Sequence, residues 1–200
     1  MQISNLTKRS SMLYSCNVYF VQGDWNAINA ANTLVDVGSD PGVIDRIAGM
    51  PAGIGGRVIE QVILTHSHSD HTAILELVRE KFKPVVYARS ASLAPDVLLE
   101  DGQRLVCGDR EFQVIWTPGH SEDSVCLYSP SDGTLFAGDV PVVVRSGEDN
   151  YDDRLVQTLE RLCREETRTI YFGHGPSLHK DVQAVLTESL RNVRAAQSVR

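Results

Sequence analysis

The sequence has few cysteines and no long basic run. None of the four cysteines among its 200 residues forms a C-x-x-C pair, which is typical of reduced, buried thiols rather than of disulfides or a thiolate zinc site. The net charge is −7, which argues against nucleic acid or an anionic membrane surface as a partner. No segment approaches the roughly 20 apolar residues of a membrane span. We therefore expect a soluble, cytoplasmic protein.

The chain also lacks repeats, low-complexity tracts and a proline-rich linker, so one domain over 1–200 is expected. Short β-prone runs alternate with segments of helical periodicity, which predicts a mixed α/β fold. Strands are expected at 12–21, 32–38, 58–65, 84–88, 103–106, 111–116, 124–129, 133–137 and 169–173, and helices at about 70–82, 151–164 and 179–196.

Three of the six histidines fall within the six residues HSHSDH at 66–71. His66 and His68 are two positions apart at the end of an expected strand, and side chains at i and i+2 of an extended segment point the same way. Asp70 and His71 follow on the first turn of the next helix, where the helix N-terminus favours a carboxylate. Both pairs can therefore face one cavity.

Three more candidates occupy the same kind of position. His120 lies in WTPGH, Asp139 in FAGD and His174 in FGHG, each just after an apolar strand. A rigid strand followed by a short loop holds side chains accurately in place. Five of the six histidines and two aspartates are thus expected to converge at one edge of the fold.

The order of these motifs carries a resemblance. His-x-His-x-Asp-His at 66–71 is followed by TPGHS, FAGD and GHG, and it is preceded by CNVYFV and LVDVG. This arrangement resembles the metallo-β-lactamase superfamily over nearly the whole chain. The resemblance implies an α/β fold of the αββα type, in which two mixed β-sheets are flanked by helices and metals bind along one sheet edge.

The resemblance also implies two groups of metal ligands that share one carboxylate. It assigns the first metal to His66, His68 and His120, the second to Asp70, His71 and His174, and the bridging position to Asp139. Asp36 matches an aspartate behind the ligands, where it would fix the tautomer of a histidine or, equally, cap a turn.

Nitrogen and carboxylate ligands without thiolates suit zinc, with iron or manganese as alternatives. We expect two divalent metal ions, because a metal lowers the pKa of bound water to about 7 and a pair of metals can share the resulting hydroxide. The hypothesis is that this bridging hydroxide attacks a carbonyl carbon and that water or Asp70 protonates the leaving group.

The resemblance favours a small-molecule hydrolase of thioesters, esters or lactones, similar to glyoxalase II. Substrate selectivity is expected in the loops at 22–31 and 140–152. Trp25, Arg145 and Tyr151 are the side chains there that can stack on or pair with a ligand, although ordinary surface packing explains each of them as well.

Two other functions stay open. A sulfur (persulfide) dioxygenase with one iron needs only His66 or His68, His120 and Asp139, but the arginine-rich signature of those enzymes is absent after Asp139. A non-catalytic metal-binding module on the same fold is the second alternative, and the intact ligand set argues against it.

Overall fold

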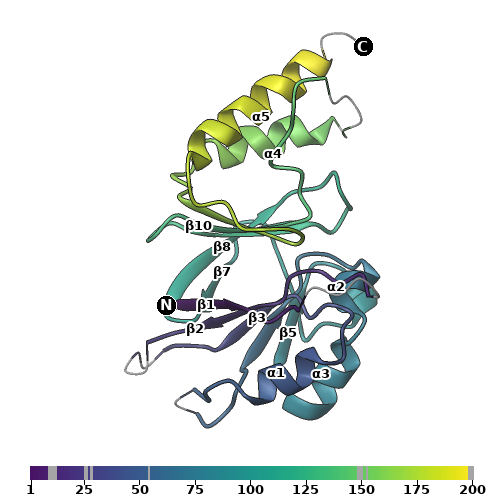
Figure 1. Ribbon diagram of the computed structural model, residues 1–200, viewed down its shortest axis with the longest axis vertical. Helices are drawn as coiled ribbons and strands as arrows, with labels where there is room; N and C mark the ends of the chain where they lie inside the picture. The colour runs from purple at the N-terminus through teal and green to yellow at the C-terminus, as the bar shows by residue number, and fades with distance from the viewer. Residues whose placement is uncertain are drawn as a thin grey trace.

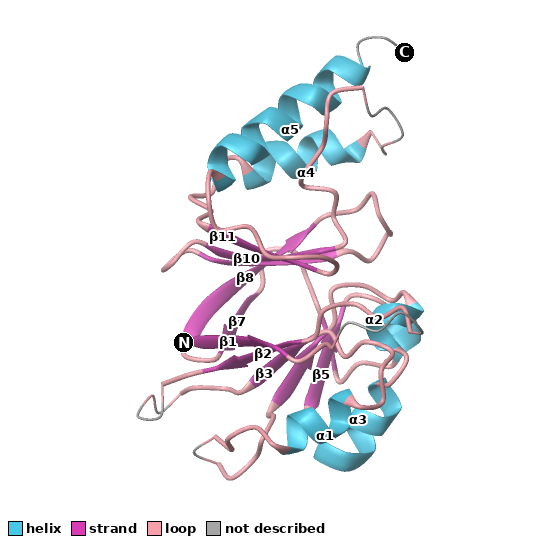
Figure 2. Cartoon of the chain, in the orientation of Figure 1, coloured by secondary structure: helices cyan, strands magenta, loops and turns pink. Residues whose placement is uncertain are grey.

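Two β-sheets face each other and carry helices on their outer sides (Figures 1 and 2). The computed structural model describes residues 1–8, 13–24, 27, 29–53, 55–147, 151 and 153–197. Within this part of the chain, no helix is both long and apolar enough to cross a membrane. The expected α/β sandwich of two mixed sheets flanked by helices is confirmed.

The first sheet has six strands in the order β1-β2-β3-β4-β5-β6. The first three strands pair antiparallel, and β3 to β6 pair in parallel. Helices α1 (Val43–Ala48) and α3 (Leu75–Phe82) lie against its outer face, at the bottom of Figure 1. The strands are β1 (Gln2–Asn5), β2 (Tyr19–Gln22), β3 (Thr33–Val35), β4 (Gln61–Ile63), β5 (Val85–Ala88) and β6 (Val97–Leu98).

The second sheet has five strands in the order β11-β10-β9-β8-β7, and only β10 and β11 pair in parallel. Helices α4 (Arg154–Leu162) and α5 (Val182–Gln197) cover its outer face, at the top of Figure 1. The strands are β7 (Arg104–Cys107), β8 (Arg110–Trp116), β9 (Val125–Ser129), β10 (Thr134–Gly138) and β11 (Thr169–Phe172).

The strands carry apolar side chains on both faces, so each sheet packs against the other sheet on one side and against helices on the other. Along β9, Val125 and Leu127 pack between the two sheets, whereas Cys126 and Tyr128 pack under α4 and α5. Alternate strand residues point to opposite faces, so a run that is apolar at every position is buried on both sides. The continuous apolar runs in the sequence therefore become the central strands of a four-layer fold.

The expected strand at 12–21 is wrong over much of its length. Residues 13–18 are described and are not strand, and β2 begins at Tyr19. The amide of Cys16 donates to the carbonyl of Asp70 (3.1 Å), and the amide of Asn17 donates to the carbonyl of Gly173 (2.6 Å). Because these amides bind to α2 and to the loop after β11, the segment runs past the histidine cluster without joining a ladder.

The expected helix at 70–82 is interrupted. It forms α2 (Ser69–Thr72), which holds Asp70 and His71, and then α3. The carbonyl of His71 accepts hydrogen bonds from the amides of Val37 and Gly38, both at 3.0 Å. That carbonyl therefore binds the turn after β3 instead of an amide of the next helical turn, and the helix is interrupted there. The sequence analysis also missed β1, α1 and β6, which are all short.

Candidate metal centre

Four loops bring the candidate ligands to one end of the sandwich. His66 and His68 follow β4, His120 follows β8, Asp139 directly follows β10, and His174 follows β11. The strands hold these loops, and α2 adds two more side chains from its short turn. The structure thereby brings together seven side chains that the sequence spreads over more than 100 residues, namely His66, His68, Asp70, His71, His120, Asp139 and His174.

The first group contains His66, His68 and His120. One ring nitrogen of each lies within 4.8 Å of the others, and Nε2 of His120 is 3.0 Å from Nδ1 of His68. His66 is buried, whereas the other two are exposed. Zinc–nitrogen bonds of about 2.0–2.1 Å in a tetrahedral arrangement separate neighbouring ligand atoms by about 3.3 Å. The group therefore has the chemistry and spacing of a divalent metal site.

The second group contains Asp70, His71, Asp139 and His174. Nε2 of His174 lies 3.0 Å from Oδ2 of Asp70, and Nε2 of His71 lies 3.2 Å from Oδ1 of Asp139. His71 is fully buried, and the other three are half-buried. Two nitrogens and two carboxylates at this spacing also suit a divalent metal.

Asp139 lies between the two groups. Its Oδ2 is 3.6 Å from Nε2 of His120 in the first group and 3.4 Å from Nε2 of His174 in the second. The carboxylate is therefore placed to contact metals on both sides.

Unsatisfied polar atoms show that the residues fit a metal. Eight buried side-chain polar atoms of the described residues lack a hydrogen-bond partner, and Nε2 of His66, Nε2 of His71 and Oδ1 of Asp139 are three of them. Leaving such atoms unpaired costs about 1–3 kcal/mol each, and buried polar atoms in native proteins nearly always have a partner. All three atoms belong to the candidate ligands, and a metal ion held by these groups would satisfy them.

A hydrogen-bonded network behind the ligands fixes their orientation. Oδ2 of Asp36 accepts from Nδ1 of His71 at 2.9 Å. The Thr65 hydroxyl lies 2.9 Å from the same oxygen and 3.1 Å from Nδ1 of His66. Asp36 has a left-handed backbone (φ 59°), which aspartate tolerates better than most residues. Partners of this kind leave Nε2 of each histidine available to a metal.

The electrostatics of the metal-free site favour neutral imidazoles at one group and a carboxylate between the two. Desolvation and the charge of His71 lower the pKa of His66 to about 4, and desolvation also lowers the pKa of His120. Burial opposes ionisation of Asp139, but Nε2 of His71, 3.2 Å from Oδ1, and the positive charge on that ring lower the pKa of Asp139 to about 2. Burial alone would lower the pKa of His71, yet Asp36 and Asp139 raise it well above the ordinary value.

Three further residues, which were not predicted from the sequence, shape the site. A Cβ on Gly173 would lie 2.1 Å from Oδ1 of Asp139, so only glycine fits there. Thr65 precedes the HSHSDH motif and links Asp36 to His66. The ring of Tyr14 stacks on His174 with the centroids 4.8 Å apart, although 73% of Tyr14 is exposed. Gly173 is the first residue of the GHG motif, which was a usable signal for it, but no local pattern marks Tyr14.

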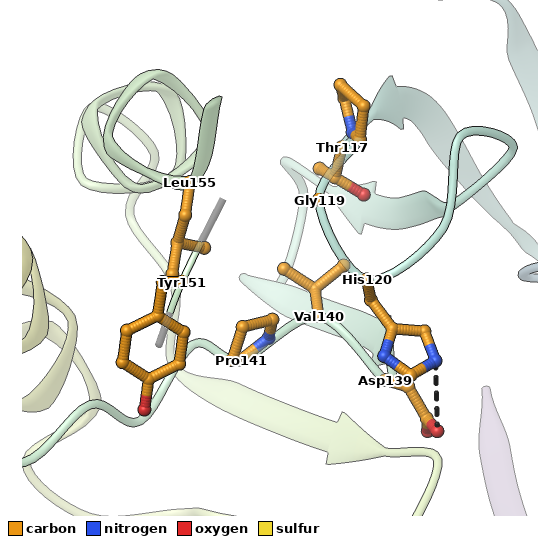
Figure 3. A pocket seen from close by; sticks show the side chains of 9 residues that line it. Thr117, Gly119, His120, Asp139, Val140, Pro141, Tyr151 and Leu155 are labelled. Carbon is orange, nitrogen blue, oxygen red and sulfur yellow. Dashed lines mark ion pairs between the residues drawn. The ribbon is translucent and has the colours of Figure 1, made fainter. Parts of the chain in front are cut away.

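A pocket of about 310 Å³ opens beside His120 and Asp139. In Figure 3, Val140 and Pro141 lie between two sides of the pocket. His120 and Asp139 are on one side, and Tyr151 and Leu155 are on the other. Of the three residues expected to contact substrate, Tyr151 lines this pocket. Arg145 is exposed and does not line it, and Trp25 lies outside the described residues.

A comparison with family models matches residues 12–94 and 87–174 to the metallo-beta-lactamase superfamily. A hydroxyacylglutathione hydrolase from Rhizobium meliloti (strain 1021) is 32% identical over 130 residues, which are 62% of this chain and 51% of that protein. A beta-lactamase-like protein 2 homolog from Caenorhabditis elegans is 27% identical over 168 residues, which are 78% of this chain and 56% of that protein. The chain thus spans about half the length of these two relatives.

Solved structures share the fold. A metallo-beta-lactamase family protein from Thermus thermophilus superposes with a TM-score of 0.71 at 19% identity, covering 96% of this chain and 79% of that one. At this identity the likeness concerns the arrangement of the sheets and helices.

Proposed function

The chain belongs to the metallo-beta-lactamase superfamily, and from that membership we propose that it is a metal-dependent hydrolase of small thioesters, esters or lactones. The resemblance seen in the sequence is thereby confirmed as to family. The hydroxyacylglutathione hydrolase among its relatives supports the thioester class. The observation that carries the proposal is the position of Asp139, within 3.6 Å of His120 and 3.4 Å of His174.

We assign one divalent metal to His66, His68 and His120, and a second to Asp70, His71 and His174, with Asp139 contacting both. Zinc is the proposed ion, because imidazole and carboxylate donors suit it, and iron and manganese are the alternatives. When bound, such metals make hydroxide available near neutral pH and polarise a carbonyl group.

The chain's own groups prepare the site for that chemistry. Asp36 and Thr65 hold His71 and His66 so that Nε2 of each is left for a metal. The lowered pKa of His66, about 4, keeps this ring neutral at pH 7 and able to donate a lone pair to a metal. Asp70 is the proposed proton carrier to the leaving group, and 19% of its side chain is exposed, which gives it contact with water.

A cysteine nucleophile does not fit this site. Cys16 is next to the ligands in the fold, but it is fully buried and burial raises the pKa of its thiol to about 12. The thiol therefore stays protonated and unreactive at neutral pH. This supports direct attack by water-derived hydroxide rather than by a cysteine thiolate.

A small molecule is the proposed substrate, because a net charge of −7 disfavours the phosphate backbone of nucleic acid. Hydrolysis should be tested with the purified, zinc-loaded protein on thioester, ester, lactone and phosphodiester panels. The proposal expects turnover of at least one carbonyl substrate and its loss after chelation. Bound metal without any turnover would instead favour the binding-module alternative.

The number of metals separates the proposal from the dioxygenase alternative. Elemental analysis of protein purified without chelator should give close to two divalent ions per chain. One iron per chain together with oxygen uptake on a persulfide would contradict the hydrolase and support the persulfide dioxygenase.

A further inference from the structure

The pocket beside the proposed metal centre has an apolar wall. Val140 and Pro141 follow Asp139 directly, and Leu155 projects from α4 toward them (Figure 3). Leu155 and Val140 are 2% and 4% exposed and present only small edges to the pocket, whereas Pro141 is half-buried and presents more of its ring. Tyr151 adds an aromatic ring on the same side. Together these side chains give this side of the pocket a largely apolar surface that carries no charge.

Positive charge is missing from the described lining of this pocket. None of the described residues that line it is a lysine or an arginine, and its imidazole and carboxylate, those of His120 and Asp139, belong to the proposed metal centre. Arg154 is adjacent to Leu155 in sequence, but its guanidinium is 2.6 Å from the carboxylate of Glu122. The hydroxyl of Thr117 is buried against the thiol of Cys126, at 3.7 Å. An anionic group would find no cationic partner among these lining residues.

We infer that this pocket binds the acyl part of the substrate and selects a neutral, apolar acyl group over a charged one. The inference rests on the proposed function and narrows its substrate class. At about 310 Å³, the cavity is at the small end of the roughly 300–1,000 Å³ typical of ligand sites. The reacting carbonyl lies at the metal centre, and the hydrocarbon chain extends between the 117–120 loop and α4.

Straight-chain carboxylates test the pocket without relying on turnover. Their carboxylate represents the cleaved acyl product, and calorimetry on the zinc-loaded protein measures Kd for acetate, butyrate, hexanoate and succinate. Burial of a methylene strengthens binding by about fourfold, so butyrate, which has two more methylenes, should bind about 15-fold more tightly than acetate. Succinate, which has the length of butyrate and a second charge, should bind at least tenfold more weakly than butyrate. Equal affinities along the series, or a preference for succinate, would overturn the inference.

Variants at one wall test where the chain binds. Y151R introduces a cation into the pocket and should shift the butyrate-to-succinate preference toward succinate by about tenfold. V143R is the matched control, since Val143 is on the same loop but 47% exposed and outside the pocket lining, and it should keep the wild-type preference. Y151A, which adds no charge to the pocket, should reduce the increase in affinity that each added methylene gives. The same preference in Y151R and wild type would place the acyl group elsewhere.

Hydrolysis of butyryl and succinyl thioesters of one thiol then separates the two proposals. Chain-length dependence of Kd without hydrolysis of any carbonyl substrate would contradict the hydrolase and retain the apolar pocket. Hydrolysis with equal affinity for all four carboxylates would retain the hydrolase and overturn the pocket.

Discussion

Nδ1 of His71 lies 2.9 Å from Oδ2 of Asp36, and both side chains are almost completely buried. The same carboxylate accepts a hydrogen bond from the backbone amide of Thr65 at 2.8 Å, and the Thr65 hydroxyl contacts His66. Asp36 therefore supports both ligand groups, one directly and one through Thr65. From the sequence, Asp36 could either fix the tautomer of a histidine or cap a turn. In the structure its carboxylate is hydrogen-bonded to both His71 and Thr65.

D36N should weaken metal binding at the second group by about 10–100-fold, the usual cost of losing a hydrogen-bonded partner behind a metal ligand. The amide is a poorer acceptor for the Nδ1–H of His71 and carries no charge. Zinc titration against a competing chelator measures the change. D45N is the matched control, because Asp45 is 92% exposed, and it should bind zinc like wild type. Unchanged affinity in D36N would remove Asp36 from the site.

H71A should abolish occupancy of the second group and leave the first largely filled. His71 supplies Nε2 to the second group, whereas the first draws on His66, His68 and His120. Elemental analysis should fall from about two ions per chain to about one. H179A is the control, because His179 is exposed and its ring contacts Ser177 instead. Equal loss from both groups in H71A would contradict the assignment.

G173A should disrupt the second group through steric overlap. The added Cβ would lie 2.1 Å from Oδ1 of Asp139 and 2.8 Å from Cε1 of His71, so both side chains must move. We expect at least a tenfold loss of zinc affinity and a destabilisation of about 1–3 kcal/mol from overpacking, measured by titration and by denaturant unfolding. G55A is the matched control, because a Cβ on Gly55 would have no atom within 4 Å, and it should leave zinc affinity and stability unchanged. Wild-type affinity in G173A would show that the site tolerates the shift.

Acidification should empty the second group before the first. Metal ligation requires the deprotonated ring nitrogen, so bound protons compete with the metal and affinity falls as the pH falls below the pKa of the metal-free site. The pKa of His71 is raised, so its proton competes across the neutral range. The pKa of His66 is lowered to about 4, so protons compete for that ring only near pH 4. Occupancy measured after equilibration at pH 7.5, 6.5 and 5.5 should show this order, and parallel loss would contradict it.

The sequence by itself determined the class of the fold and the candidate ligands. Its apolar runs specify strands buried on both faces, since a side chain such as Cys126 faces the helices while its neighbour Leu127 faces the other sheet. The ligand candidates were readable because each follows an apolar run that ends in a short turn, as Asp139 follows TLFAG. Such local signals depend only on neighbouring residues.

Contacts between distant segments decided the rest. The break between α2 and α3 arises because the His71 carbonyl accepts from the amides of Val37 and Gly38. Residues 13–18 leave the expected strand because the amides of Cys16 and Asn17 donate to the carbonyls of Asp70 in α2 and of Gly173. Tyr14 and His174 are 160 positions apart in sequence, yet their rings stack. Periodicity and propensity carry no information about such pairings, because a hydrogen bond between remote loops forms only once the sheets have brought them together.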